Sequence, residues 1–168
     1  LGQFILTGSA VPADMSQVEH SGTGRFAWLT MRPMSLWESG NSTGMVSLKE
    51  LFEGNKSVAG EVSHELDDIA YLICRGGWPR AIDMETDIAL DQAKDYVDGV
   101  VHSDISRVDG VQRSAETTRK LLRSYARHQG TQATIGTITA DMTTGGGFDI
   151  SEKTVSSYIN ALQDIFVI

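Results

Sequence analysis

The sequence predicts a mostly α-helical protein that opens with the end of an α/β core and closes with a winged helix-turn-helix. Two short apolar segments near the start, residues 4–6 and 25–31, have the length and composition of β-strands. From residue 48 to residue 162, apolar side chains recur mainly at steps of three and four, which indicates amphipathic helices. A strand-like run at 165–168 follows the last of these helices, where a wing would begin.

The first region, residues 1–40, is predicted to be the edge of an α/β core. Phe4-Ile5-Leu6 breaks into the polar turn Thr7-Gly8-Ser9-Ala10, as expected for a buried strand that delivers polar groups to a site. Arg25 to Met31 is the second expected strand, and the span between them suits a short helical crossover. Two strands do not make a sheet, and the chain begins with Leu1 rather than Met. We therefore expect this chain to be the C-terminal part of a longer protein.

Composition narrows the class of protein. The sequence is 40% hydrophobic and 21% charged, and it contains no apolar run long enough to span a membrane. Cys74 is the single cysteine, so an intrachain disulfide is impossible and a reducing cytoplasm is the expected compartment. The four histidines lie far apart without ligand spacing, which disfavours a structural zinc site.

The net charge of −8 is unevenly distributed along the chain. Residues 38–100 hold thirteen acids and five bases, whereas residues 101–130 hold six bases and three acids. An acidic middle argues against broad nucleic-acid binding, because phosphate contacts need clustered Lys and Arg. His64, Asp67 and Asp68 share a predicted helix face and could suggest a metal site, but a solvated acidic face is the favoured interpretation.

Residues 47–107 are predicted to form a helical region. A short helix follows Ser47, and a clearer one begins near Glu61 and ends at the Gly76-Gly77-Trp78-Pro79 turn. The expected inward stripe of this second helix consists of apolar residues at helical spacing: Val62, Leu66, Ile69, Ala70 and Ile73. A third helix is expected from Thr86 to His102, followed by a break at 103–107.

Residues 114–168 are predicted to form a winged-helix domain that stops at the wing. Ser114 should cap a helix that ends near Gln129, and Ser151 should cap the final helix. A short helix lies between them. Its apolar positions are Ile135, Ile138 and Met142.

These segments together resemble one family of prokaryotic AAA-type ATPases. The start of the chain is similar to the end of that family's nucleotide-binding core. The matching stretches are Phe4-Ile5-Leu6-Thr7-Gly8-Ser9-Ala10, Gly24-Arg25-Phe26 and Met31-Arg32-Pro33-Met34-Ser35-Leu36-Trp37-Glu38. The family also carries a C-terminal domain of unknown function with a Gly-Gly-aromatic-Pro turn, an Asp-Ile step and a winged helix. Gly76 to Pro79, Asp104-Ile105 and the stretch from Thr154 to Ile168 match these in order.

The resemblance implies an ATP-binding parent protein with magnesium, in which residues 47–107 form a lid-like region. The chain has no glycine-rich loop ending in Gly-Lys-Ser or Gly-Lys-Thr, so it is expected to hold no cofactor or metal and to be inactive alone. Thr7 resembles the sensor that touches the terminal phosphate or the attacking water, or else it caps a strand-end turn. Arg25 resembles the arginine that reaches a neighbouring subunit's nucleotide, or else it is a surface residue paired with an acid; Arg32 shares this ambiguity. The implied partners are the missing ATPase core and further copies of the chain.

A DNA-binding winged-helix regulator is the alternative function. Its recognition helix would be residues 151–163, where Glu152 and Lys153 offset one another. An interaction module is favoured over DNA binding, and the protein partner stays open. The side chains that could contact either a nucleic acid or a protein are Arg119, Lys120, Arg123, Arg127, Lys153 and Asn160.

Overall fold

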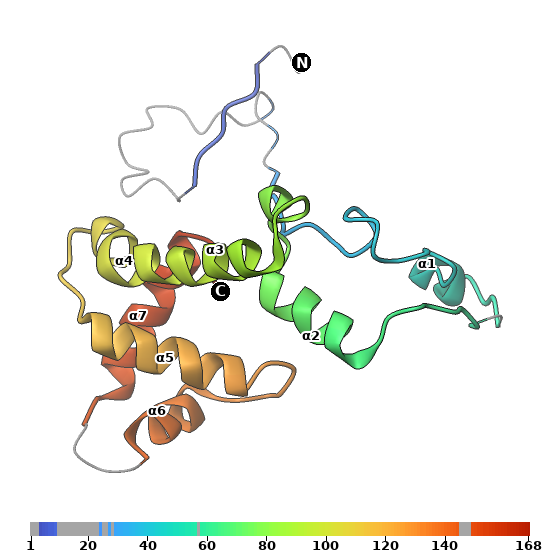
Figure 1. Cartoon of the computed structure of the whole chain (residues 1–168). Coiled ribbons are helices and arrows are strands. Elements are labelled where there is room, and N and C mark those ends of the chain that lie inside the picture. The colour runs from blue at the N-terminus through green and yellow to red at the C-terminus, as the bar shows by residue number, and fades with distance from the viewer. Residues whose placement is uncertain (1–3, 10–23, 25–26, 28, 57, 145–148) are drawn as a thin grey trace. The chain divides into compact units, whose positions relative to one another are not determined.

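The computed structural model describes residues 4–9, 24, 27, 29–56, 58–144 and 149–168 (Figure 1). The chain divides into two compact units, one of residues 28–96 and one of residues 97–168 together with 1–27. Within the described ranges, all regular structure is helical and no β-strand forms. In this part of the chain, no helix has both the length and the apolar character needed to cross a membrane.

The predicted α/β core end is therefore wrong. Phe4, Ile5 and Leu6 lie in an irregular segment and are almost fully exposed. Of the second predicted strand, Arg25, Phe26 and Trp28 lie outside the described residues, and the remaining residues up to Met31 form no strand. The physical reason is pairing, because a strand is stable only when a neighbour satisfies its backbone groups and a second layer covers its side chains. The described chain supplies neither.

The described part of residues 28–96 contains two short helices, a tight turn and, from residue 86, most of a third helix. Helix α1 spans Leu48–Phe52, and the Ser47 hydroxyl caps it by accepting a hydrogen bond from the Glu50 amide at 3.3 Å. Helix α2 spans Leu66–Arg75 and begins with a capping box between Glu65 and Asp68. It therefore starts later than predicted, because Glu65 and Asp68 together satisfy the amides of its first turn.

The Gly76-Gly77-Trp78-Pro79 segment ends α2 as predicted. Gly76 adopts a φ of +71°, which favours glycine, and the 3₁₀ turn Pro79–Ala81 follows. A Cβ atom on Gly77 would lie 2.6 Å from the Met34 carbonyl oxygen, and the Met34 amide donates to the Gly77 carbonyl at 2.9 Å. The Trp78 ring packs against Tyr96 with ring centroids 4.6 Å apart. This turn thus holds two distant backbone segments in direct contact.

Helix α3 spans Thr86–Gly99 and leads into the second unit through a π-helical turn, Val100–Asp104, and the short helix α4, Ile105–Arg107. The sequence predicted a break near residue 103 instead. The wider π-turn shifts the phase of the helix, and it places Val100, Val101 and Ile105 all in buried positions.

Three capped helices complete the second unit and confirm the prediction for these segments. They are α5 (Ala115–Arg127), α6 (Ile135–Thr143) and α7 (Glu152–Asp164). Ser114, Thr134 and Ser151 each accept a hydrogen bond from the amide three residues later. Their apolar faces form one core with the end of the π-turn and α4. Its buried members are Val100, Ile105, Leu121, Ile138, Met142, Val155, Ile159, Ala161 and Leu162.

The strand predicted at 165–168 is also wrong, so the wing of the expected winged helix is not formed here. The Phe166 amide donates to the Gln163 carbonyl and the Val167 amide to the Leu162 carbonyl, both at 2.9 Å. Phe166 has a φ of +58°. Together these features define a Schellman motif, which closes α7 by satisfying its last carbonyls. Ile165, Val167 and Ile168 then pack against the helical core.

We predict that Leu121→Ala lowers the free energy of unfolding by about 3 kcal/mol, because Leu121 is fully buried and its truncation leaves a cavity among α5, α6 and α7. Urea denaturation followed by circular dichroism measures the change. Val111→Ala, at an exposed apolar position of the same unit, is the matched control and should cost less than about 0.5 kcal/mol. Equal effects of the two substitutions would contradict this description of the core.

Candidate interaction surface

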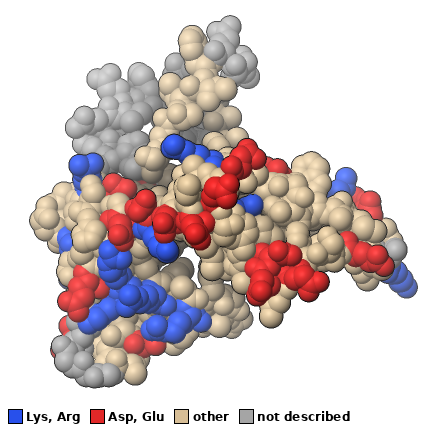
Figure 2. Space-filling view, viewed as in Figure 1, with Lys and Arg blue, Asp and Glu red and all other residues tan. Residues whose placement is uncertain are grey.

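The predicted contact residues of α5 form a basic surface (Figure 2), and most of them have partners within their own unit. Arg119 Nη2 lies 2.6 Å from Asp98 Oδ1, at the end of α3. Lys120 pairs with Glu116 at 3.0 Å, one turn earlier on α5. Arg123 is exposed and forms no hydrogen bond or ion pair with the described residues. Much of the positive charge on α5 is therefore offset locally.

Arg127 connects α5 to α6. Its Nη2 and Nε atoms lie 2.5 Å and 3.1 Å from Asp141 Oδ2. The Ser124 hydroxyl and then the Arg127 guanidinium lower the pKa of Asp141, because both stabilise its charged form. The arginine thus helps to set the position of α6 on α5 as well as the charge of the surface.

Arg113 is a buried arginine whose contacts the sequence did not predict. Its side chain is 2% exposed, and its two terminal nitrogens each lie 2.7 Å from an Asp109 carboxylate oxygen. Arg113 also donates to the Ile105 carbonyl at 2.9 Å and lies over the Tyr158 ring, 5.7 Å from the centroid. The Tyr158 hydroxyl in turn accepts a hydrogen bond from the Ser114 amide at 2.9 Å. These contacts attach the loop before α5 to α4 and α7.

The Arg113 network changes the acidity of its members. Hydrogen bonding to Arg113 lowers the pKa of Asp109 to about 2, and Asp109 in return raises the pKa of Arg113. The i, i+4 spacing of Asp109 and Arg113 was visible in the sequence. That spacing signals an ion pair only within a helix, whereas these residues lie in the segment between α4 and α5.

The predicted contact residues of α7 are exposed. Lys153 and Asn160 both lie on the solvent side of the helix. Lys153 helps to line a shallow pocket of about 350 Å³ at the start of α7, and the other lining residues are Val111, Gln112, Arg113, Thr154, Ser157 and Tyr158. Because Asp109 offsets the charge of Arg113, Lys153 is the remaining cation among these lining residues.

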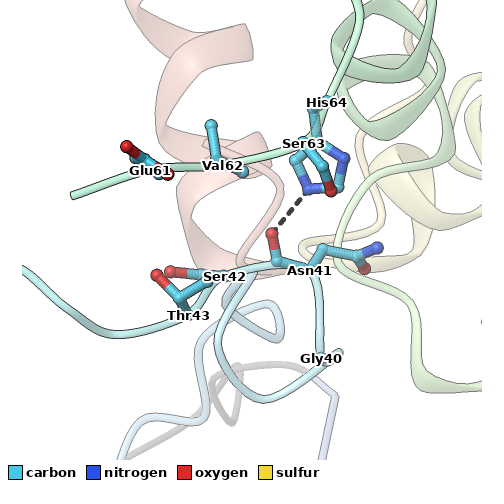
Figure 3. A pocket seen from close by; sticks show the side chains of 8 residues that line it. All are labelled: Gly40, Asn41, Ser42, Thr43, Glu61, Val62, Ser63 and His64. Atoms are coloured by element: carbon cyan, nitrogen blue, oxygen red, sulfur yellow. Dashed lines mark hydrogen bonds between the residues drawn. The ribbon is translucent and has the colours of Figure 1, made fainter.

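A polar pocket in the unit of residues 28–96 is lined by two short segments, 40–43 and 61–64, with a volume of about 440 Å³ (Figure 3). His64 Nε2 lies 2.7 Å from the Asn41 carbonyl oxygen and joins the segments. The Asn41 side-chain oxygen accepts hydrogen bonds from Ser39 at 2.8 Å and Arg75 at 3.3 Å. In the described ranges, no three potential ligands gather to hold a metal ion.

The structure describes only one of the two residues that were predicted to serve the parent's active site. Thr7 is exposed in an irregular segment. Arg25 lies outside the described residues, so its predicted role stays a prediction.

Comparison with known families finds one match. Residues 66–168, more than half of the chain, match the sequence model of a domain of unknown function, DUF8612. No curated protein and no solved structure matches the chain. The match begins at the first residue of α2 and covers the whole helical core of the second unit.

We predict that acid weakens the fold through Asp109. Its pKa is lowered in the folded protein, so its contribution to stability is complete well above pH 3.8 and is lost as the pH falls toward 2. Because the carboxylate is 44% exposed, we expect a loss of only about 1 kcal/mol after allowing for solvent screening.

Thermal unfolding between pH 5 and pH 2 measures this contribution. Asp109→Asn should remove that part of the pH dependence and destabilise the protein at pH 7 by about 2 kcal/mol, because it leaves Arg113 buried without a carboxylate. Asp104→Asn, at an exposed position of the same unit, is the control. An unchanged pH profile in Asp109→Asn would contradict the assignment.

Proposed function

We propose that this chain, which belongs to the DUF8612 family, is a protein-interaction module of an AAA-type ATP-binding protein. One observation carries the interaction role, which is the set of large apolar side chains left exposed in the described part of residues 28–96. It includes Leu36, Trp37, Met45, Leu48, Phe52, Leu66 and Ile73. Large apolar side chains that the chain leaves uncovered favour association, because their burial by a partner is favourable.

The link to an AAA-type protein rests on the resemblance of the ordered motifs. Met34 and Gly77, which belong to two of those motifs, are joined by a 2.9 Å backbone hydrogen bond, and this supports the idea that the motifs act as one device. ATP and magnesium would belong to a nucleotide-binding core of that protein, to which Thr7 and Arg25 would contribute. Further copies of the chain are the other proposed partners, and the single Cys74 supports a reducing cytoplasm as the compartment.

Contact with a protein is favoured over contact with DNA. Arg119, Lys120 and Arg127 each have an acidic partner at 3.0 Å or less in their own unit. A phosphate backbone would have to displace these carboxylates, and the affinity gained per phosphate would fall accordingly. The α5 surface is better suited to a partner of mixed charge.

We predict that the natural protein containing this chain hydrolyses ATP and that Arg25→Ala lowers its turnover at least about 100-fold with ATP affinity nearly unchanged, because the arginine would act on charge that develops during transfer. Steady-state turnover and equilibrium binding of a fluorescent ATP analogue separate the two effects. Arg80→Ala, at an exposed arginine of the described chain, is the control. Normal turnover in Arg25→Ala would exclude its catalytic role, and a wild-type protein without ATPase activity would overturn the link to AAA-type proteins.

We also predict that the chain does not bind duplex DNA at moderate salt. Fluorescence anisotropy of a labelled duplex should stay flat up to about 10 µM protein, because the α5 cations are mostly paired. Arg123→Ala removes a cation of the α5 surface that has no ion-pair partner among the described residues, and it should leave the result unchanged. Binding that falls steeply with salt and is weakened by Arg123→Ala would favour the DNA-binding alternative.

A further inference from the structure

Helix α2 exposes the apolar stripe that the sequence predicted to face inward, and it buries the opposite side instead. The buried residues of α2 are Leu72, at 8% exposure, and Arg75, at 4%. The predicted inward stripe faces solvent instead, with Leu66 79% exposed, Ile73 75% exposed and Ile69 44% exposed. Ala70 and the preceding Val62 are exposed as well. A strongly apolar helical face is therefore left without cover by the described residues.

Carboxylates flank this stripe at its N-terminal end. Glu61, Glu65, Asp67 and Asp68 are all exposed, and none of them forms an ion pair with the described residues. Glu65 and Asp68 make the capping box, so their local role is known, whereas Asp67 has no such bond. Figure 2 shows the acidic atoms gathered over α2. We call Leu66, Asp67, Ile69, Ala70 and Ile73 the acid-flanked face.

We propose that the acid-flanked face binds an amphipathic helix of a partner protein in which Lys or Arg flanks an apolar stripe. Leu66, Ile69 and Ile73 are spaced by three and four residues, which is the pattern that receives a second helix packed alongside. α2 has 10 residues and so is about 15 Å long, enough to contact nearly three turns of the partner. This inference rests on the interaction role proposed above and names the chemistry of the partner.

The charge of the acid-flanked face favours a basic helix over a second copy of the chain as the bound partner. The chain has a net charge of −8, and two acid-flanked faces packed together would bring unpaired carboxylates into one interface. A basic helix would cover the same apolar side chains and also supply the missing positive charge. An anionic surface, including a lipid surface, is disfavoured by the same carboxylates.

The test uses a synthetic peptide of about 14 residues with leucines on one helical face and lysines beside them, and a second peptide in which glutamates replace the lysines. Fluorescence anisotropy with the full chain should show binding of the lysine peptide that weakens with salt, and at least about tenfold weaker binding of the glutamate peptide. Equal binding of the two peptides, or no binding of either, would overturn the proposal.

Variants of the chain test whether binding occurs at α2. Ile73→Asp should weaken binding of the lysine peptide at least about tenfold, and Asp67→Asn about two- to fivefold. Val111→Asp and Asp95→Asn make the same chemical changes at exposed positions elsewhere and should have no effect beyond a small general charge effect. If the control variants weaken binding as much as the α2 variants, the attraction is non-specific and the proposal fails.

Two further measurements separate loss of peptide binding from misfolding of the variant and from self-association of the chain. Circular dichroism of Ile73→Asp should match the wild-type chain, because the side chain is already exposed; Leu66→Asp repeats the test at the other end of the stripe. Sedimentation should show that any self-association of the wild-type chain persists in Ile73→Asp, whereas a dimer abolished by Ile73→Asp would make a second copy the occupant and overturn the proposal. Loss of the ATPase link would leave these binding results unaffected, so the two hypotheses can fail separately.

Discussion

The need of each helix to cover its apolar face is the constraint on which this structure depends. In residues 97–168 the need is met internally, because the π-turn, α4, α5, α6 and α7 bury their apolar side chains against one another. Leu121, Val155 and Leu162 are fully buried at the centre of that packing. In residues 28–96 the need is not met by the described chain, and α2 presents its best apolar stripe to solvent. One unit is self-sufficient, while the other is suited to association.

The sequence predicted α5, α6 and α7 well because their signals are local. Ser114 and Ser151 stand where a hydroxyl can cap the following helix, and the apolar periodicity that follows each cap requires no distant partner to be recognised. The end of α7 shows the limit of such signals. Ile165 to Ile168 has the composition of a strand, yet its backbone closes the helix through a left-handed Phe166. A phenylalanine in that conformation carries no sequence signal, because glycine is the residue that marks it.

The wrong prediction for α2 has a different origin. The period of α2 correctly identified an apolar stripe, but a period does not state which face a neighbouring element covers. Arg75 lies on the opposite, buried face, and its hydrogen bond to Asn41 connects that face to a loop 34 residues earlier in the chain. For the candidate contact residues, the sequence placed the cations of α5 on one surface but could not show their partners. Asp98 and Asp141 lie on other helices, 21 and 14 residues away in the chain.

The two opposite faces of α2 make different contacts: one face makes polar contacts within its own unit, and the other presents an apolar stripe to a partner. Its inner face carries Arg75, which donates a hydrogen bond to the Asn41 side-chain oxygen. The same oxygen accepts a hydrogen bond from Ser39, and the Asn41 carbonyl oxygen accepts one from His64. Its outer face carries the uncovered apolar stripe. A partner bound on the outer face would stabilise the helical form of α2, by an amount that rises with the logarithm of the partner's concentration once that concentration exceeds the Kd. Because Arg75 is the last residue of α2 and donates to Asn41, the same binding would also favour the contact with the loop at residues 39–43. A change at the outer surface is thereby coupled to the polar pocket within the same unit, with no movement of one unit against the other required.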